Sequence, residues 1–406
     1  MPRQNVLTLN AGSSSIKFAL FSCSTAAQVE GILEGVIERV GEVPLARIKS
    51  SEGADLHQEV LPEGSTHEFC TTWLLGWLAV RNLRYDAVAH RVVHGGTRHT
   101  VPVRIDAQVL DSLEQLVALA PLHQPHNLAG IRAILRASPD IAQVACFDTA
   151  FHAAQPVAAR RYALPLDFAD RGVLAYGFHG LSYDYVSRHA LVKERVRNVV
   201  LHLGSGSSAC AMRNGESVAS SMGFTALDGL VMGTRCGTLD PGVVLHLLRE
   251  GRSLSEVEDV LYRKSGLKGL CGYADMRDVV RAMDAGAQVA AEAFVHFVQA
   301  AADHVTRLAG RMQGLDQLVF TAGIGENQPL VRQAICERLS WLGVSLDEEA
   351  NNRTFEGVLS RQGSPVRVVV VPTNEERMLA LHALDLLAPP TRCMKGVRVR
   401  CSQCVD

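Results

Sequence analysis

The chain has 406 residues, enough for two or three domains or for one large duplicated unit. Hydrophobic residues make up 47%, charged residues 20%, and the net charge is −2, which excludes a strongly basic nucleic-acid binder and an acidic disordered chain. No apolar run approaches the roughly 18 residues of a membrane helix, and the run at 6–9 is too short for a secretory signal. We therefore expect a cytoplasmic protein with no membrane or nucleic-acid partner.

Ten cysteines raise the question of disulfides or a metal site. Eight are scattered, several within apolar runs that look like strands, which predicts reduced core cysteines. Cys401 and Cys404 form one C-x-x-C motif, which supplies two ligands where a structural zinc site needs four. We expect residues 391–406 to be a solvated basic tail, and a metal or redox role for the cysteine pair stays open as the alternative.

Strand-like and helical patterns alternate along the chain, which predicts an α/β fold. In the first half we expect strands at 5–10, 16–21, 86–93 and 143–147, weaker ones within 45–60, and helices at 68–83, 107–120 and 126–137. In the second half we expect strands at 198–203, 207–213, 317–322 and 366–371, and helices at 241–250, 254–263, 275–284, 285–313 and 375–387. Asn214-Gly215 predicts a hairpin turn.

One strand-turn-strand pattern occurs twice, about half the chain apart. Residues 7–14 (LTLNAGSS) and 201–208 (LHLGSGSS) agree at both leucines and at the final Gly-Ser-Ser. This repeat predicts two related domains that each present one turn of small residues. We place the first at 1–148, completed by a C-terminal helix at 385–390, and the second at 149–384.

Gly-Ser turns expose backbone N–H groups and hydroxyls without bulk, which suits phosphate oxygens. Two such turns facing each other would form a phosphate cradle, to which Lys17 could add positive charge, although a plain hairpin turn is the alternative for each. No G-x-x-x-x-G-K-[ST] motif occurs, so the chain is not a P-loop ATPase. Gly204-x-Gly206 begins a loose dinucleotide fingerprint, but a strand follows where that fingerprint needs a helix. The strand-to-glycine turn at 320–327 could let an adenosine group approach the backbone.

Five charged or titratable residues stand out by their surroundings. Arg91 and Arg235 lie beside glycines, so an anion could reach either guanidinium, although an ordinary ion pair is the alternative for each. Asp148 ends a predicted strand, where carboxylates commonly face the ligand crevice of an α/β sheet. His179 lies between glycines, which is unusual for a core histidine, whereas His123 alone is more typical of a structural role.

Together these motifs resemble the acetokinase family, within the actin, sugar kinase and heat-shock chaperone ATPase superfamily. The matching segments follow the family's order: 10–15 (NAGSSS), 90–96 (HRVVHGG), 147–152 (FDTAFH), 176–180 (YGFHG), 221–225 (SMGFT), 232–235 (MGTR), 321–327 (TAGIGEN) and 372–376 (PTNEE). The resemblance implies two duplicated ribonuclease H-like (actin-like ATPase) domains flanking a central cleft, usually in a homodimer.

The implied activity is reversible phosphoryl transfer from ATP to the carboxyl group of acetate, giving acetyl phosphate and ADP by direct in-line transfer. Mg²⁺ or Mn²⁺ would be the cofactor and ATP or ADP the co-substrate. A carboxylate acceptor is already ionised at neutral pH, so no strong general base is needed. Catalysis would then rest on positioning and electrostatics.

The resemblance also implies roles for individual residues. The catalytic set is Arg91, His123, Asp148, His179 and Arg235. Arg91, Val93, Leu122, Phe178 and Ala226 would bind the acyl group, and Asn10, Ser13 and Ser15 would face the phosphate region. The nucleotide would meet Lys17, His202, Gly204, Ser205, Gly206, Gly323, Ile324, Gly325, Glu326 and Asn327, and the metal would meet Asn10, Asp148 and Glu375.

Departures from the family pattern leave alternatives open. Ala226 stands where the family usually has proline, which would widen the acyl pocket and make a propionate or short-chain acyl kinase the alternative. Ser205 replaces a common asparagine in the nucleotide turn. A nucleotide-binding ATPase or sensor without acyl kinase activity is the alternative from another class. The retained Arg91, Asp148, His179 and Arg235 argue against it, since ATP hydrolysis alone needs no acyl pocket.

Overall fold

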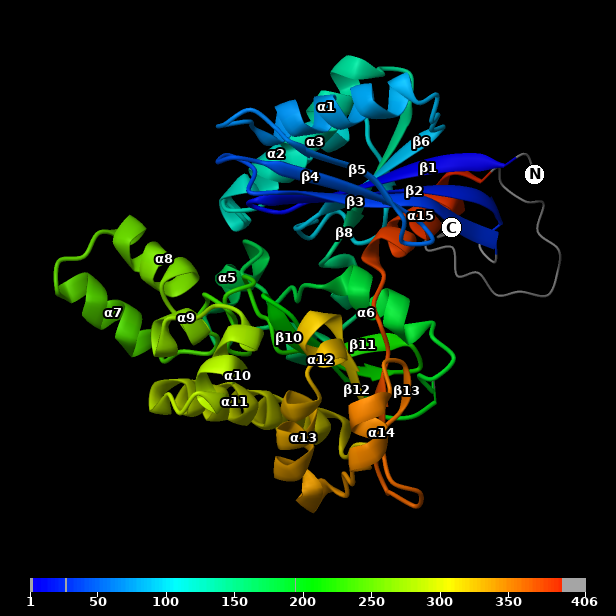
Figure 1. Ribbon diagram of the computed structural model, residues 1–406. Helices are drawn as coiled ribbons and strands as arrows, with labels where there is room; N and C mark the ends of the chain where they lie inside the picture. The colour runs from blue at the N-terminus through cyan, green and yellow to red at the C-terminus, as the bar shows by residue number, and fades with distance from the viewer. Residues whose placement is uncertain (1–2, 26–27, 194, 389–406) are drawn as a thin grey trace, which may run out of the picture.

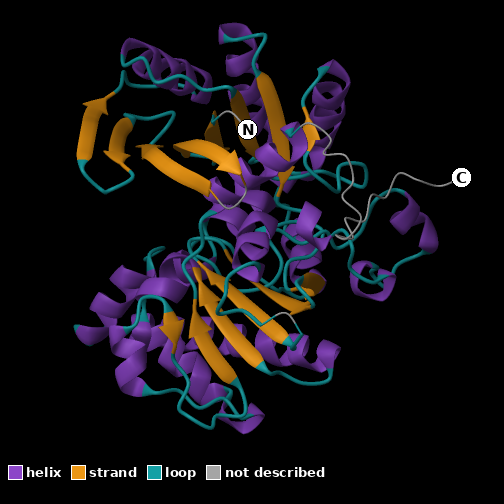
Figure 2. Cartoon of the chain, turned by 90° about the vertical axis from the view of Figure 1, so that its right-hand side faces the viewer, coloured by secondary structure: helices purple, strands orange, loops and turns teal. Residues whose placement is uncertain are grey.

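Two β-sheets organise the structure, one in each half of the chain (Figures 1 and 2). The computed structural model describes residues 3–25, 28–193 and 195–388. Within these ranges the first sheet has eight strands, in spatial order β5 (Asp55–Val60), β4 (Leu45–Ser50), β3 (Gln28–Glu38), β2 (Ser15–Thr25), β1 (Gln4–Ala11), β6 (Ala87–Val92), β8 (Ala142–Phe147) and β7 (Val103–Arg104). The second has six over the same ranges: β11 (Glu216–Ser220), β10 (Ser207–Arg213), β9 (Asn198–Leu203), β12 (Gln317–Thr321), β14 (Arg367–Val370) and β13 (Gly357–Val358).

The two sheets share one topology. In the first, β1, β2 and β3 pair antiparallel, and β6 and β8 continue parallel to β1. In the second, β9, β10 and β11 pair antiparallel, and β12 and β14 continue parallel to β9. The expected repeat therefore corresponds to the β1–β2 and β9–β10 hairpins. This arrangement confirms an α/β fold built from two duplicated units.

Helices cover the faces of the sheets and connect the strands. The first half contains α1 (His67–Val80), α2 (Ala107–Gln115), η1 (Leu116–Leu119), α3 (Gln124–Ala137), η2 (Ala150–His152), α4 (Val157–Arg160), α5 (Leu166–Asp170) and α6 (Gly180–Ser187). The second half contains α7 (Pro241–Arg249), α8 (Leu254–Arg263), α9 (Gly266–Cys271), α10 (Met276–Asp284), α11 (Gln288–Met312), α12 (Ala322–Asn327), α13 (Pro329–Arg338), η3 (Ser340–Leu342), α14 (Glu348–Arg353) and α15 (Glu375–Leu387). Among the described residues, no helix is both long and apolar enough to cross a membrane.

The last helix crosses back to the first sheet. In Figure 1, α15 lies against β1 and β2, far from the C-terminal sheet that precedes it. Its Met378, Leu379 and Ala383 are buried in one core cluster with Val6 and Ala89 of the first sheet. We propose that all of α15 belongs to the first unit. The expectation placed only 385–390 there, and 389–390 lie outside the described residues.

Several elements differ from the sequence-based expectation. Strand β3 was not expected, because Gly31 and Gly35 interrupt its apolar pattern; the Phe18 ring occupies the space that a side chain at Gly35 would need. The prediction of a turn after β12 was wrong. Helix α12 begins directly after the strand, at Ala322, although it contains two glycines, which are poor helix formers. Helices α6 and α13 were not expected either. Tertiary packing, rather than the local sequence pattern, determines the secondary structure of these segments.

The cysteines within the described ranges are free, and five are buried: Cys23, Cys70, Cys146, Cys210 and Cys336. Burial raises the pKa of the Cys210 thiol to about 12, so this residue behaves as a small apolar side chain. Cys393 and the C-x-x-C pair Cys401 and Cys404 lie outside the described residues.

Candidate active site

A cavity of about 630 Å³ lies where the two units meet, at the strand ends that carry the Gly-Ser turns. It is lined by Asn10, Gly12, Ser13, Ser14, Ser15, Lys17, Arg91, His123, His179, His202, Gly204, Ser205, Gly206, Arg235, Ala322, Gly323, Glu326, Thr373, Glu375 and Glu376. Most residues predicted for catalysis and for phosphate contact therefore lie around one space. The predicted residues outside this list lie nearby and are placed below.

Arg91 and Asp148 form a buried ion pair at the cavity wall. Their strands, β6 and β8, are parallel neighbours, so both side chains emerge at the same edge of the sheet. Arg91 Nη2 lies 2.5 Å from Asp148 Oδ2 and Arg91 Nε lies 3.0 Å from Oδ1. Arg91 Nη1 also donates to Asn10 Oδ1 at 3.1 Å, and Asn10 Nδ2 donates to Glu375 Oε2 at 3.2 Å. The guanidinium is thus fixed from two sides.

The charges of this pair depend on each other. Burial alone would lower the pKa of Arg91, but the charge and hydrogen bonds of Asp148 outweigh burial and raise that pKa above its ordinary value. Burial raises the pKa of Asp148, and the Arg91 guanidinium opposes that rise. Removing either partner would leave a buried charge without compensation.

Arg235 enters the cavity from the second unit and has no carboxylate partner among the described residues. Its Nη1 donates to the backbone oxygen of Ala226 at 3.1 Å, and its Nη2 lies 3.4 Å from His123 Nε2. Burial, followed by Arg235 and Arg91, lowers the pKa of His123 to about 3, so its neutral ring accepts this hydrogen bond. An incompletely paired guanidinium at a cavity wall is suited to an anion.

His179 occupies an unusual backbone position. Its φ of 58° is left-handed and precedes α6, whose first N–H, that of Gly180, donates to the backbone oxygen of Asp148 at 2.9 Å. A side chain at Gly180 would collide with that oxygen, which explains the glycine. Burial lowers the pKa of His179 well below its ordinary value, helped by the nearby His202 and Arg91. The ring is therefore neutral at physiological pH.

An apolar cluster borders Arg235, whose Nη1 lies 3.1 Å from the backbone oxygen of Ala226 and 3.8 Å from Met232 Sδ. Val93, Phe178, Ala120, Met222 and Met232 are buried together, and Ala226 packs against them partly buried. Three of the predicted acyl-binding residues, Val93, Phe178 and Ala226, are thus in one cluster, and Leu122 is half-buried outside it.

A second cavity, of about 510 Å³, adjoins the first through Gly204, Ser205 and Gly323, which line both. It is also lined by Ile324, Asn327 and residues of the segment 274–277. Gly325 lines neither cavity, since it is buried in α12 beside Phe320 and Leu201. Glu326 accepts hydrogen bonds from the N–H groups of Ala322 at 2.7 Å and Thr373 at 3.0 Å. This carboxylate therefore ties α12 to the segment before α15.

Comparison with known proteins decides the family. The chain matches the acetokinase family over residues 5–381. The chain belongs to the acetokinase family. It is similar to the acetate kinase of Methylocella silvestris, with 47% identity over 398 residues that cover 94% of this chain and 98% of the relative.

Two solved structures resemble this acetokinase closely. The propionate kinase from Francisella tularensis subsp. tularensis SCHU S4 is 35% identical, with a TM-score of 0.88 over 95% of this chain and 100% of that one. The acetate kinase from Porphyromonas gingivalis is also 35% identical, with a TM-score of 0.84 over the same shares of the two chains. The similarity spans both units of the acetokinase fold.

Sequence reasoning did not predict a role for Asn127 or Glu376 in this acetokinase site. Asn127 of α3 donates to the Ala11 backbone oxygen at 2.7 Å and accepts from the Val93 N–H at 3.0 Å, so it joins the ends of β1 and β6. Glu376 lines the main cavity, and burial, followed by the charge of Glu375, raises its pKa. Glu376 directly follows a predicted metal residue, which was an available signal. Asn127 gave none.

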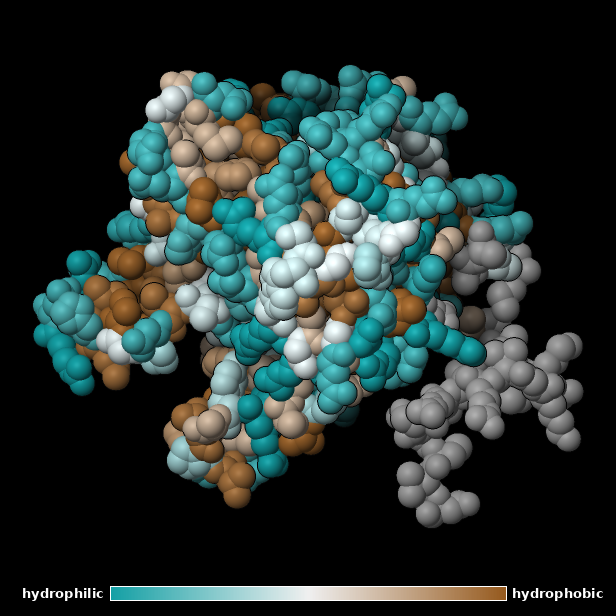
Figure 3. Space-filling view, turned by 90° about the horizontal axis from the view of Figure 1, so that it is seen from below, coloured by the Kyte–Doolittle hydropathy of each residue, from teal (hydrophilic) through white to brown (hydrophobic). Residues whose placement is uncertain are grey.

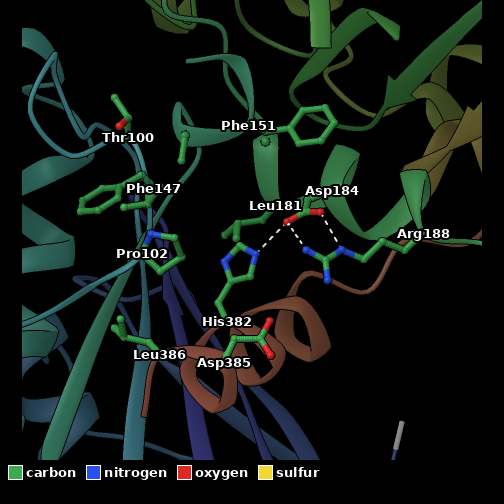
Figure 4. Close-up of a pocket in the computed structure, with 13 residues that line it drawn as sticks. Thr100, Pro102, Phe147, Phe151, Leu181, Asp184, Arg188, His382, Asp385 and Leu386 are labelled. Carbon is green, nitrogen blue, oxygen red and sulfur yellow. Dashed lines mark hydrogen bonds and ion pairs between the residues drawn. The ribbon is translucent and has the colours of Figure 1, made fainter. Parts of the chain in front are cut away.

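A further cavity, of about 460 Å³, lies between Phe147, Phe151 and Leu181 on one side and His382 and Leu386 of α15 on the other (Figure 4). Its walls are mainly apolar, and Asp184 of α6 lies between two basic partners there. Arg188 Nε is 2.8 Å from Asp184 Oδ1, and His382 Nε2 of α15 is 2.7 Å from Oδ2. This contact links α15, the last helix, to α6.

Replacing Asp184 with asparagine should destabilise the protein by about 1–3 kcal/mol at pH 7. Burial alone would raise the pKa of Asp184, but the hydrogen bonds from His382 and Arg188 lower it overall. The contribution of the carboxylate is therefore complete above the unfolded pKa of about 3.9 and is lost as pH falls through the lower folded pKa. Urea unfolding at pH 7 and at acidic pH measures this. The matched variant Asp385→Asn changes an exposed carboxylate of the same cavity and should have little effect.

Proposed function

We propose that this chain transfers the γ-phosphoryl group of ATP reversibly to acetate, forming acetyl phosphate and ADP. The observation that carries the proposal is the convergence of Arg91 and Arg235, one from each unit, on one cavity beside an apolar cluster. Acetate is a carboxylate anion with a short apolar body. The arginines complement its charge, and the apolar cluster complements its methyl group. The comparisons with acetate kinases support acetate as the substrate.

The two arginines meet the central electrostatic difficulty of the reaction. ATP carries about −4 and the acid −1, so the reactants repel each other unless cations lie between them. Arg91 is held by Asp148 and Asn10, whereas Arg235 keeps hydrogen-bonding capacity for an anion. We propose that Arg91 and Arg235 bind the carboxylate of the acid and the phosphoryl group that is transferred. Preorganised donors of this kind stabilise transition-state charge without further rearrangement.

We place the nucleotide across the two adjoining cavities. The main cavity, with the turns 12–15 and 204–206 and Lys17, would receive the phosphates through backbone N–H groups and hydroxyls. The adjoining cavity, with Gly323, Ile324 and Asn327, would receive the adenosine. Gly325 would then support this region from within α12, whereas Glu326, which lines the main cavity, would border the phosphates.

The carboxylates of Glu375 and Glu376, beside the proposed phosphate site, fit a magnesium ion. Among the described residues, no group of three or more His, Cys, Asp or Glu side chains is arranged to hold a metal. Mg²⁺ does not need one, because it keeps several waters and binds through one or two carboxylates plus substrate phosphates. Glu375 lines the cavity, and Oε1 of Glu376 is buried without a hydrogen-bond partner. We propose Glu375 as the metal carboxylate, with Asn10 and Asp148 beside it; the ion would neutralise phosphate charge.

A hydroxamate assay tests the proposed function. The purified chain is supplied with ATP and Mg²⁺, or Mn²⁺, and with acetate, propionate or butyrate in turn. We expect acyl phosphate formation with acetate at the highest kcat/KM. Absence of acyl phosphate from all three acids, with ATP hydrolysis that no carboxylate stimulates, would favour a nucleotide-binding ATPase or sensor instead.

Ala226 gives a prediction about chain length. Ala226→Pro should raise the preference for acetate over propionate by roughly tenfold, because the ring narrows the pocket by about the volume of a methylene group. The Ala226 N–H makes no hydrogen bond within the described residues, so proline removes none. The measurement is kcat/KM for both acids, with Ala226→Ser as the control of similar volume. An unchanged ratio would show that Ala226 does not set chain length.

We propose a homodimer that covers α7 and α8. Helix α7 buries none of its residues, and Leu245, Leu248 and Leu254 are 50%, 41% and 69% exposed. Figure 3 shows apolar side chains gathered on the projecting lobe where Figure 1 places these helices. Exposed apolar patches of this kind mark interaction surfaces. A cytoplasmic location is part of the same proposal, since the reaction consumes ATP.

The double variant Leu245→Glu and Leu248→Glu should convert the dimer to a monomer, as measured by light scattering, because charges would be buried at the interface. Val80→Glu, at an 81% exposed position of α1, is the matched control and should remain dimeric. A wild-type chain that is monomeric at micromolar concentration would contradict the proposal.

A further inference from the structure

Two stacked histidine rings at the cleft each have a serine hydroxyl at Nδ1. The ring centroids of His179 and His202 are 4.2 Å apart with an interplanar angle of 17°. Ser208 Oγ lies 2.8 Å from His179 Nδ1, and Ser182 Oγ lies 2.8 Å from His202 Nδ1. Both rings line the main cavity. Which ring nitrogen carries the proton therefore decides what each ring presents to a bound phosphate.

Tyr183 determines the direction of the hydrogen bonds. This residue is fully buried, and its hydroxyl oxygen lies 2.5 Å from Ser208 Oγ, its sole side-chain hydrogen-bond partner in the described part of the chain. A buried O–H without an acceptor is more costly than an oxygen with an unused lone pair, so Tyr183 donates to Ser208. Ser208 then directs its own proton to the remaining partner, His179 Nδ1. Nδ1 is therefore an acceptor, and the ring proton is on Nε2.

We propose that Tyr183 and Ser208 are positioning residues, which hold His179 as the neutral tautomer whose Nε2–H donates to the transferring phosphoryl group. Nε2 is on the cleft side of the ring, since a Cβ added at Gly206 would lie 3.3 Å from it and 3.8 Å from Nη1 of Arg235. The phosphoryl group as recipient rests on the proposed function. The tautomer is a property of the free protein.

The neighbouring ring has the same arrangement. Ser182 is buried, and His202 Nδ1 is the sole partner of its hydroxyl within the described ranges, so Ser182 donates and His202 also carries its proton on Nε2. Burial is the main cause that lowers the pKa of His202 to about 3. The stacked pair thus supplies two uncharged N–H donors near Arg91 and Arg235. Such donors add hydrogen bonds to phosphate without adding a third repelling charge beside the guanidinium groups.

NMR of the full chain labelled with ¹⁵N-histidine tests the tautomer directly. The signal of His179 is identified by its loss in His179→Gln. At pH 7 we expect a protonated Nε2 and an unprotonated, hydrogen-bonded Nδ1. Ser208→Ala removes the donor, so the Nδ1 resonance should move toward that of a free acceptor. We expect kcat to fall about tenfold while KM for acetate and for ATP stays within about twofold, because the donor acts on the transition state.

Two tyrosine variants complete the design. Tyr183→Phe should change the His179 signal and kcat in the same direction as Ser208→Ala, but less, since Ser208 remains. Tyr176→Phe also removes a phenol hydroxyl, which donates to the Gly172 oxygen at 2.7 Å, and should leave both unchanged. A proton on Nδ1 in the wild type, or unaltered His179 signals in Ser208→Ala, would overturn the inference. An Nε2–H tautomer in a chain that makes no acyl phosphate would refute the proposed function and leave the tautomer assignment intact.

Discussion

Replacing Arg235 with alanine is expected to lower kcat by about 1,000-fold or more while changing the free energy of unfolding little. Arg235 has no carboxylate partner among the described residues, so its removal leaves no buried acid uncompensated. Burial is the main cause that lowers its pKa, and the charge of Arg91 adds to that effect, so the folded protein gains little from this cation. Its charge and hydrogen-bond donors would instead serve the anions of the reaction.

The hydroxamate assay measures kcat of this variant, and urea unfolding measures its free energy of unfolding. Arg235→Lys is the matched control: it retains the charge but not the planar fork of donors, so we expect an intermediate kcat. Near-normal turnover of Arg235→Ala would show that this residue does not bind the carboxylate or the phosphoryl group.

Replacing Arg91 with alanine should reduce both turnover and stability. We expect kcat to fall by about 1,000-fold and the free energy of unfolding to fall by about 3–5 kcal/mol, because Asp148 stays buried without its partner. The side chains of the pair are 16% and 2% exposed, so solvent cannot replace the lost interaction. Arg47→Ala breaks an ion pair with Glu38 whose side chains are 45% and 47% exposed, and should cost less than about 1 kcal/mol.

The double variant Arg91→Ala and Asp148→Asn separates the two effects. Removing the uncompensated charge should restore part of the stability but none of the turnover, because the guanidinium is still absent. Recovery of turnover in the double variant would contradict a catalytic role for Arg91.

Local patterns predicted the parts of the fold that local chemistry decides. The Gly-Ser turns at 12–14 and 204–206 lie between alternating apolar runs, and both hairpins are present. Asp148 lies after a buried strand parallel to the strand of Arg91, so their proximity follows from the α/β architecture. Strand β3 could not be predicted in this way, because the need for Gly35 appears only when the Phe18 ring lies over it.

Contacts between residues far apart in the sequence could not be predicted from local sequence patterns. Asn10 and Glu375 are hydrogen-bonded although 365 residues separate them, and no spacing rule connects such positions. The roles of Asn127, Ser208 and Tyr183 likewise depend on atoms that only the folded chain brings together. Family resemblance named the residues that face the cavity. It also named Asn10 and Asp148, which hold Arg91, but it did not name Asn127, Ser208 or Tyr183.

The position of α15 has a consequence for how the protein is made. Met378, Leu379 and Ala383 belong to the core of the first sheet, yet they are among the last described residues to leave the ribosome. Domains generally fold as units during synthesis, beginning at the N-terminus. Here one apolar face of the first sheet stays uncovered until α15 has been translated. We therefore expect nascent chains to present a hydrophobic surface to chaperones while the second unit is translated.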